Sequence, residues 1–272
     1  MDIVICGCVR NCETYIDKVF ENILKIKTIC NLKKVVLAYD ESSDKTLLKL
    51  INLKKNHRDI EIDILINRNK LHSQRTQNIS NARNQIMRQL KQVNFKIDYY
   101  IMMDFDDVCA LPIDITVLQN ALNDHEKWDC VTFNNKNYYD FWALSIGPFK
   151  YSCWHWTNPH EIIRLMNTHL QKEFESTSDY VYCDSAFNGF GVYKYDVFKD
   201  CVYNCVLTHN MIDYDSIIEV VRKYMIQPII RHVIYDVEHK PLHTNAVNAR
   251  KAISKECLFE PYLGDHASFL RE

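Results

Sequence analysis

The sequence predicts a single α/β domain in which a mainly parallel sheet is flanked by helices, and three observations support this class. The chain has 272 residues, 47% of them hydrophobic, which is enough for one large core. Strand-like and helix-like segments alternate through the first half of the chain. The apolar run 99–103 ends in a cluster of aspartates. Continuous apolar runs are typical of strands that are buried on both faces, and ligands bind at the carboxyl ends of such strands.

The elements of the first half follow from two repeated patterns. Short apolar runs bounded by polar residues predict strands at 2–9, 34–39, 60–66 and 99–103. Between them, apolar residues recur at helical spacing, which predicts helices at 12–29, 46–55 and 73–93. A strand–helix–strand order of this kind gives parallel neighbours joined by right-handed crossovers.

The second half of the chain is less regular. An aromatic-rich, irregular stretch is expected at 138–157. Around it the patterns predict helices at 113–123 and 159–173 and strands at 130–133, 192–206 and 229–237. No internal repeat, low-complexity tract or linker divides the sequence. One domain over residues 1–272 is therefore expected.

Composition and charge argue against several classes of protein. A net charge of −2 provides no broad basic surface, so a nucleic-acid partner is not expected. No apolar run approaches the roughly 20 residues that span a membrane. The apolar segment 3–9 lacks a basic lead and is stopped by Arg10, so no signal peptide is expected. The eleven cysteines lack zinc-ribbon spacing and are expected to be reduced thiols of a cytoplasmic protein.

The aspartates at 104, 106 and 107 are the main candidate for a functional site. Carboxylates this close together repel one another and lose hydration at the end of a buried strand, so a cation is needed to stabilise them. Mg²⁺ and Mn²⁺ bind one or two carboxylates together with phosphate oxygens. The alternative is a loop that only caps the next helix. Three carboxylates in four positions favour a metal site in an enzyme that acts on a nucleoside-diphosphate substrate.

A buried arginine is expected on the third helix. Arg83 falls between Ile79 and Leu90 on the apolar stripe of 73–93, where an arginine requires an anion. That anion is either a protein carboxylate, Asp104 being the candidate, or the pyrophosphate of a ligand, to which arginine binds well. Arg75, near the start of the same helix, is a second candidate for phosphate binding because helix N-termini favour phosphate.

Two further residues are expected at the same edge of the sheet. Asp40 follows the second strand, where nucleotide-binding folds often place an acid on the ribose or base. Arg10 follows the first strand and is expected beside it. The glycine-rich dinucleotide fingerprint and the P-loop lysine motif are both missing from the sequence, which argues against NAD enzymes and P-loop phosphotransferases.

Taken together, these residues resemble glycosyltransferases of the GT-A fold, and most of all the fungal capsule-associated α-mannosyltransferase family with its relatives in large DNA viruses. The resemblance extends from about residue 2 to residue 245. It rests on Cys6-Gly7-Cys8-Val9-Arg10-Asn11, Tyr39-Asp40-Glu41-Ser42-Ser43-Asp44, Arg75-Thr76, Ala82-Arg83-Asn84, Asp104-Phe105-Asp106, Tyr139-Asp140-Phe141-Trp142-Ala143-Leu144 and Asn188-Gly189-Phe190-Gly191.

The resemblance implies a role for each matching residue. Asp104 and Asp106 correspond to the Asp-x-Asp pair that holds Mn²⁺ or Mg²⁺ on the donor diphosphate. Asp40 corresponds to the acid that binds the base or ribose, and Arg83 to the cation that steadies the diphosphate or donor sugar. Residues up to about 110 are then the nucleotide-sugar-binding half, and residues from about 111 to 272 the acceptor-binding half.

A histidine near the C-terminus completes the metal site in many GT-A enzymes. His243 is the first candidate here and His239 the second; the alternative for each is an ordinary core or surface histidine. Ser145 is a departure, since relatives are expected to carry an arginine there, and donor or acceptor specificity will differ if that arginine contacts either substrate.

Asp184 is the expected catalytic residue on the acceptor side. Negative charge develops on the departing diphosphate, where a metal ion and an arginine stabilise it. An inverting enzyme also needs a base that deprotonates the acceptor hydroxyl, and Asp184 is the candidate. In a retaining enzyme the same carboxylate would orient the acceptor instead. The alternative is a loop cap.

The function expected from these residues is transfer of a hexose, mannose or glucose, from a UDP- or GDP-linked sugar to a hydroxyl of a glycan or glycoprotein. The location expected is cytoplasmic, in the host cytoplasm if the chain is viral. A nucleotidyltransferase that makes nucleotide sugars is a second hypothesis, disfavoured because the first loop has Gly7 alone. A non-catalytic carbohydrate-binding relic is a third, disfavoured by the intact Asp104, Asp106, Arg83 and Asp184. Donor sugar, base, acceptor, stereochemistry and oligomeric state stay open.

Overall fold

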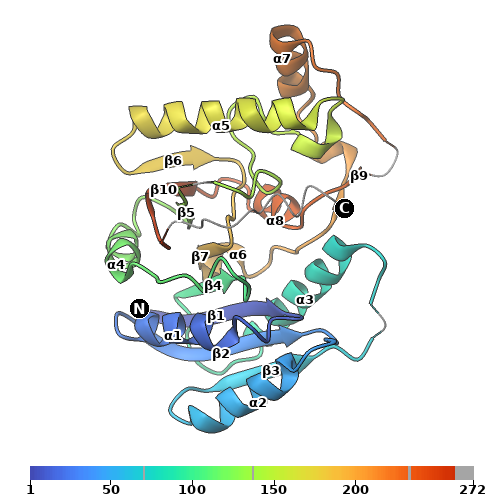
Figure 1. Cartoon of the computed structure of the whole chain (residues 1–272). Coiled ribbons are helices and arrows are strands. Elements are labelled where there is room, and N and C mark those ends of the chain that lie inside the picture. Colours follow the sequence, from blue (N-terminus) through green and yellow to red (C-terminus); the bar gives the residue numbers. More distant parts are fainter. Residues whose placement is uncertain (70, 137, 232–233, 261–272) are drawn as a thin grey trace.

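An eight-stranded sheet runs through the molecule in the order β3-β2-β1-β4-β7-β5-β10-β6 (Figure 1). The computed structural model describes residues 1–69, 71–136, 138–231 and 234–260. In the first half, β1 (Asp2–Val9) pairs in parallel with β2 (Asn31–Tyr39) and with β4 (Tyr99–Met103). β3 (Ile62–Ile66) extends this parallel arrangement from β2. The parallel half-sheet expected from the strand–helix alternation is confirmed.

The strands of the second half complete the sheet with a mixed pattern. β7 (Phe190–Lys194) lies between β4 and β5 (Cys130–Asn134) and runs antiparallel to both. β10 (Lys251–Cys257) is parallel to β5, and β6 (Tyr180–Cys183) is antiparallel to β10 at the far edge. The predicted fold class, a mainly parallel sheet flanked by helices in one domain, is confirmed.

Helices cover both faces of this sheet, and none in the described part of the chain is long and apolar enough to cross a bilayer. Those expected at 12–29, 46–55, 73–93, 113–123 and 159–173 are all present, with slightly different ends. The α-helices are α1 (Ile16–Lys27), α2 (Thr46–Asn56), α3 (Arg75–Leu90), α4 (Ile115–Asn123), α5 (Pro159–Ser176), α6 (Tyr195–Phe198), α7 (Tyr214–Tyr224) and α8 (His239–Asn245).

Two of the expected strands are much shorter than predicted. The segment 192–206 holds only the end of β7, then α6, and reaches β8 (Val206–Leu207) at its last residue. β7 ends at Lys194, which pairs with Tyr99, the first residue of β4, so the β4–β7 ladder ends there. In 229–237, β9 (Ile234–Tyr235) pairs only with the two residues of β8, and positions 232–233 lie outside the described residues.

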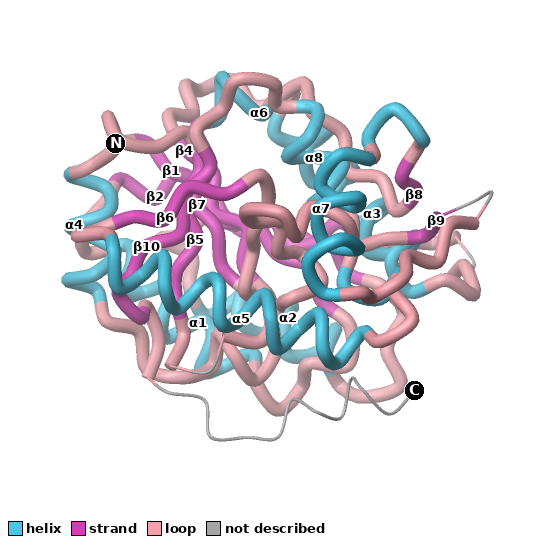
Figure 2. Tube along the Cα trace, turned by 90° about the horizontal axis from the view of Figure 1, so that it is seen from above, coloured by secondary structure: helices cyan, strands magenta, loops and turns pink. Residues whose placement is uncertain are grey.

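Alternate residues of the central strands face two apolar layers. In β1, Ile3 and Ile5 pack in a core with α1 and α4, whereas Val4 and Cys6 pack in a second core with α3 and α8. Figure 2 shows α1 and α8 on opposite sides of the strands. Because both faces are covered, these strands carry continuous rather than alternating apolar runs. A third cluster joins α5 and α7 to the aromatic stretch that begins near residue 138, at the top of Figure 1.

Candidate active site

Three aspartates follow the last residue of β4 at the centre of the sheet. Every residue of β4 is buried, so the loop that carries Asp104 and Asp106 starts from a fixed position. The backbone N–H of Asp104 donates to the carbonyl of Gly189 over 2.9 Å, which ties the loop to the start of β7. The Asp106 carboxylate accepts a hydrogen bond from the N–H of Val108 over 3.3 Å. The two carboxylates are thus presented at the carboxyl end of a central strand, where α/β sheets bind ligands.

The charges in this loop repel each other. Burial raises the pKa of Asp104 to about 8, and the charge of Asp106 adds to the effect while Arg83 opposes it. Burial raises the pKa of Asp106 to about 6, with a further contribution from Asp107. Two carboxyl groups that resist ionising together are stabilised by a cation, and their hard oxygen atoms suit Mg²⁺ or Mn²⁺. The donor set therefore fits the expected metal.

Arg83 links this loop to the end of the chain. It lies on α3 with 4% of its surface exposed, and Nη2 is 3.2 Å from Asp104 Oδ1. Nη1 is 2.5 Å from Glu238 Oε1, and Nη1 also contacts His239 Nε2. Burial disfavours the charged guanidinium, but the negative charges of Glu238 and Asp104 outweigh the effect of burial and raise the pKa of Arg83. Of the two anions expected for Arg83, the structure shows the protein carboxylates; a diphosphate contact stays a prediction.

The structure places Arg10 and Asp40 at the same edge of the sheet, as expected for residues that follow paired strands. Val9 and Tyr39 are partners in the parallel β1–β2 ladder, and the N–H of Asp40 donates to the Val9 carbonyl over 3.1 Å. Asp40 is buried, and its Oδ1 accepts from Asn67 Nδ2 over 2.7 Å. Arg10 is exposed, with Nε 3.3 Å from the carbonyl oxygen of Glu41.

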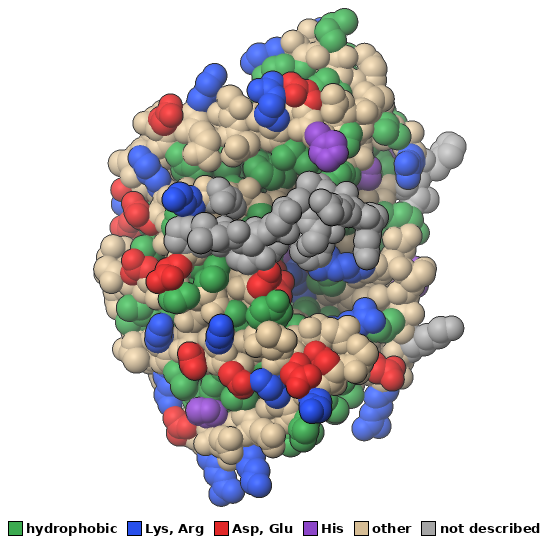
Figure 3. Space-filling model, viewed as in Figure 1, with side chains coloured by type: hydrophobic (Ala, Val, Ile, Leu, Met, Phe, Trp, Pro, Cys, Tyr) green, Lys and Arg blue, Asp and Glu red, His purple; other side chains and the backbone are tan. Residues whose placement is uncertain are grey.

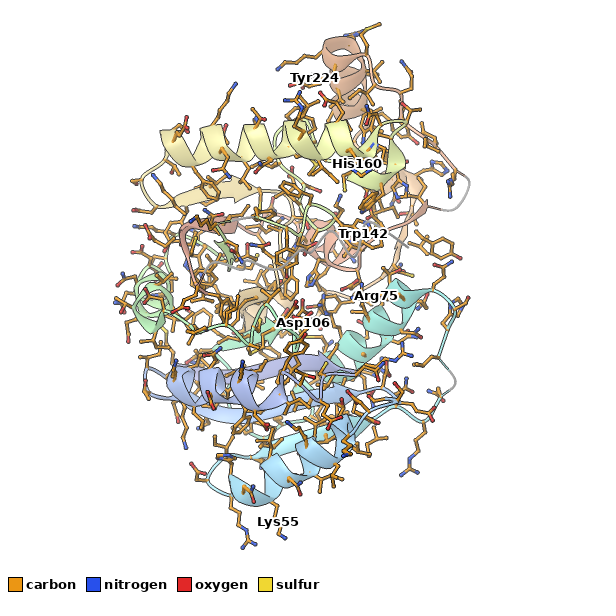
Figure 4. All side chains as sticks on the ribbon, viewed as in Figure 1. Lys55, Arg75, Asp106, Trp142, His160 and Tyr224 are labelled. Atoms are coloured by element: carbon orange, nitrogen blue, oxygen red, sulfur yellow. The ribbon has the colours of Figure 1, made fainter. Side chains whose placement is uncertain are left out.

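Arg75 is the first residue of α3, and its positive charge opposes the rise in the pKa of Asp106. In Figure 4, Asp106, Arg75 and Trp142 gather in the middle of the molecule, whereas Lys55 and Tyr224 lie at its two ends. Figure 3 shows acidic and basic side chains next to each other in the hollowed middle of the same face. The arrangement brings the positive charge of Arg75 close to the carboxylate loop, and phosphate binding by Arg75 stays a prediction.

His243 is not brought to the two aspartates. Its Nδ1 lies 2.9 Å from Ser185 Oγ, and burial lowers its pKa to about 3. Among the residues that the structure describes, no group of three His, Cys, Asp or Glu side chains is placed to hold a metal ion. Asp104, Asp106 and His243 therefore do not form a ligand set here. His239, the second candidate, is the nearer histidine, since it contacts Arg83.

Asp184 also lies apart from the carboxylate loop. It is exposed, its Oδ2 is 3.7 Å from Lys150 Nζ, and it lines a cavity of about 280 Å³ together with Ser185 and His243. Neither Asp104 nor Asp106 lines this cavity. The structure thus places the candidate metal ligands and the candidate acceptor residue in two neighbouring sites, connected through His243, His239 and Arg83.

Two acids of the site were not assigned a role from the sequence. Glu238 pairs with Arg83, and Asp140 is half-buried with its carboxylate accepting from the N–H groups of Ala143 (3.2 Å) and Asn188 (3.3 Å). Burial raises the pKa of Asp140. Asp140 lies within the Tyr-Asp-Phe-Trp segment that carries the family resemblance, and this was its only signal.

Two glycines leave room for the loop. A Cβ atom on Gly7 of β1 would lie 2.4 Å from the ring of Phe105, between the two aspartates. Gly189, whose carbonyl accepts from Asp104, has a φ of +83°, and a Cβ atom there would lie 2.6 Å from Tyr139 Oη. Glycine alone adopts this conformation without strain.

Replacing Gly189 with alanine is expected to lower the free energy of unfolding by about 1–3 kcal/mol, the usual cost of a strained backbone conformation. Urea unfolding measures the loss. The double variant Gly189→Ala, Tyr139→Phe removes the close oxygen but not the unfavourable φ, so only part of the stability should return. A single variant as stable as the parent would contradict this account of the loop.

Acidity is expected to weaken metal binding. Both aspartates hold protons more tightly in the folded chain than in the unfolded chain, where a carboxyl pKa is about 3.9. Raising the pH from about 4 through about 8 should therefore lower the free energy of unfolding of the metal-free chain, because the folded state binds more protons than the unfolded state. The same rise in pH should strengthen Mn²⁺ binding, because the metal ligands lose their protons. Melting curves and Mn²⁺ titrations across this range measure both trends. If the double variant Asp104→Asn, Asp106→Asn shows the same pH dependence of stability and of Mn²⁺ binding as the wild type, the two aspartates are not the source of these trends.

No family model and no curated protein matches the sequence. Among solved structures, S. aureus TarS 1–349 in complex with UDP-GlcNAc has a TM-score of 0.52 at 13% identity, covering 98% of this chain and 61% of that chain. The complex of TarS 1–349 with UDP gives 0.52 at 14% identity, covering 96% and 60%. The mannosyltransferase PcManGT from Pyrobaculum calidifontis, in complex with GDP-Man and Mn²⁺, gives 0.45 at 13%, covering 74% and 47%.

The likeness to TarS shows the fold: the chain has the GT-A fold, as the resemblance implied. The chain spans about 60% of the length of TarS 1–349.

Proposed function

We propose that this chain is a metal-dependent glycosyltransferase that moves a hexose from a nucleoside-diphosphate sugar to a hydroxyl of a glycan or glycoprotein. The observation that carries the proposal is the pair Asp104 and Asp106 at the carboxyl end of β4, each with a carboxyl pKa raised by burial and by neighbouring charge. The GT-A fold, shared with a protein solved with UDP-GlcNAc, supports a nucleotide-sugar donor. The relation to fungal capsule-associated α-mannosyltransferases and their viral relatives is part of the proposal.

On the donor side, Asp104 and Asp106 would hold Mn²⁺ or Mg²⁺, which supplies positive charge for the departing diphosphate. Arg75, at the N-terminus of α3, binds a phosphate oxygen with help from the helix dipole. Arg83 balances the charge of Asp104 through their ion pair. Asp40 would bind the ribose or base, and Asn67 Nδ2 holds its Oδ1 in place.

On the acceptor side, Asp184 orients or deprotonates the attacking hydroxyl. It is exposed at the wall of the cavity beside His243, so a bound acceptor reaches it without displacing buried groups. His243 is proposed as a metal ligand only if the segment that begins at His239 shifts when the donor binds. A cytoplasmic location, in a host cell if the chain is viral, is supported by the eleven free thiols.

A panel of UDP- and GDP-linked hexoses, each with and without Mn²⁺, tests the function. We expect one donor to raise the melting temperature only when Mn²⁺ is present, and the same donor to release free sugar slowly. A parallel assay with a nucleoside triphosphate and a sugar phosphate distinguishes a nucleotidyltransferase. If no donor shifts the melting temperature in the presence of metal, the proposal fails.

A further inference from the structure

The cavity beside Asp184 has a wall rich in lysine. Its volume of about 280 Å³ is just below the roughly 300–1,000 Å³ of pockets that enclose whole drug-sized ligands. It therefore accommodates a part of a substrate, such as one sugar ring or one phosphate group. Its charged lining residues are Lys150, Asp184, Asp213, Lys240 and Lys251.

The two acids of the cavity are already paired with one of the lysines. Lys150 Nζ lies 3.1 Å from Asp213 Oδ2 and 3.7 Å from Asp184 Oδ2. These contacts leave the other two lysines, Lys240 and Lys251, without a carboxylate of the cavity wall to balance them.

Lys240 is the unusual member of the wall. It is 3% exposed, and Nζ has neither a hydrogen-bond partner nor a carboxylate within 4 Å among the described residues. Asp236, four residues earlier, is engaged through Oδ1 by Trp142 Nε1 (2.6 Å) and by the N–H of Val237 (2.8 Å), while its buried Oδ2 has no hydrogen-bond partner among the described residues and does not reach Lys240. A buried ammonium group with no anion in direct contact is unfavourable, so its place beside a cavity indicates that an anion enters there.

Two further nitrogen atoms of the wall have spare donor capacity. Lys251 Nζ donates to the carbonyl of Ala246 over 3.2 Å, which leaves two of its three N–H groups. Nε2 of His243 is buried and has no partner in the part of the chain that the structure describes. When the hydroxyl of Ser185 donates to Nδ1, Nε2 carries the ring hydrogen and is itself a donor.

We infer that this cavity binds an oxyanion, a phosphate group carried by the acceptor, through Lys240, Lys251 and His243. Asp184 lies on the same wall, so an acceptor anchored by its phosphate presents a neighbouring hydroxyl to that carboxylate. The anion site stands on the cavity alone; its assignment to the acceptor rests on the proposed function.

Calorimetric titration with inorganic phosphate tests the site, at constant ionic strength and with EDTA present. The wild-type chain should bind phosphate saturably, and Lys240→Met should abolish binding. Lys251→Met should weaken it about tenfold or more, the effect of one charged hydrogen bond. Lys172→Met, an exposed lysine of α5, is the matched control and should bind as the wild type does. No saturable binding, or equal binding by the Lys240 variant, overturns the inference.

Stability provides a second readout that a structural lysine would not give. Without phosphate, Lys240→Met should melt at the same temperature as the wild type or higher, because it removes an unpaired buried charge. With phosphate, the wild type should gain stability and the variant should not. A large loss of stability in the variant at every phosphate concentration would show that a protein group partners Lys240, and the inference would fall.

Two further arms separate this inference from the proposed function. The phosphate titration uses no nucleotide, so its result holds whether or not the chain uses nucleotide sugars. Repeating it with UDP and Mn²⁺ should leave phosphate binding unchanged; loss of binding would place the phosphate in the donor site. Glucose 6-phosphate should displace phosphate while glucose should not. If neither sugar does, the anion is free phosphate and the acceptor assignment is wrong.

Discussion

Replacing Asp106 with asparagine is expected to reduce glycosyl transfer by about a thousandfold while the fold stays intact. The metal ion would lose one of its two carboxylate ligands, and such an ion contributes several kcal/mol to stabilising the departing charge. Burial and the charge of Asp107 raise the pKa of this carboxyl group, so the neutral amide removes an unfavourable charge. The melting temperature of the metal-free variant should be equal to that of the wild type or higher.

Rates of donor hydrolysis and metal-free melting curves measure both effects. Asp215→Asn, an exposed aspartate of α7, is the control for loss of one carboxylate and should change neither quantity. Full turnover by the Asp106 variant would show that the metal assignment is wrong. A variant that fails to fold would show that Asp106 stabilises the loop instead.

Replacing Arg83 with methionine is expected to lower the free energy of unfolding by about 3–5 kcal/mol, the usual cost of breaking a buried ion pair from one side. The guanidinium lies between Asp104 and Glu238 and over the ring of Phe187, 4.6 Å from its centroid. Its removal leaves two carboxylates close together without a cation. Urea unfolding of the variant measures the loss.

Two comparisons sharpen this prediction. Arg88→Met, on the exposed side of the same helix, should hardly change the free energy of unfolding. The double variant Arg83→Met, Glu238→Gln should recover part of the lost stability, because one of the two carboxylates left without a cation is neutralised. If the single variant also loses donor affinity, Arg83 contacts the diphosphate as well; a stability within about 0.5 kcal/mol of wild type would contradict the buried pair.

The first half of the fold could be predicted because its signals are local. The strands that become β1, β2 and β4 carry apolar runs, β3 alternates apolar and acidic residues at its start, and each intervening helix repeats its apolar residues at helical spacing. In the second half, α4, α5 and β5 gave the same local signals, but the other elements did not. β6 has four residues, β8 and β9 two each, and β7 is inserted between β4 and β5 by pairing that no local pattern encodes.

The site was predictable to the extent that it lies at strand ends. Asp40 and Asp104 follow parallel strands, so their shared edge was foreseeable. The pairing of Arg83 with Glu238 was not, because 155 positions separate them in the sequence. The family resemblance predicted His243 as a metal ligand, yet its Nδ1 contacts Ser185. His243 belongs to the short helix α8, which the sequence did not predict.

The central claim is that Asp104 and Asp106 hold a divalent cation on the diphosphate of a donor. Electron paramagnetic resonance of Mn²⁺ in the presence of UDP or GDP tests it directly, because free and bound Mn²⁺ give different signals. The account predicts that the wild-type chain binds one Mn²⁺ more tightly with nucleotide than without, and that Asp104→Asn, Asp106→Asn abolishes this binding. Equal Mn²⁺ binding by the wild type and the double variant would contradict it.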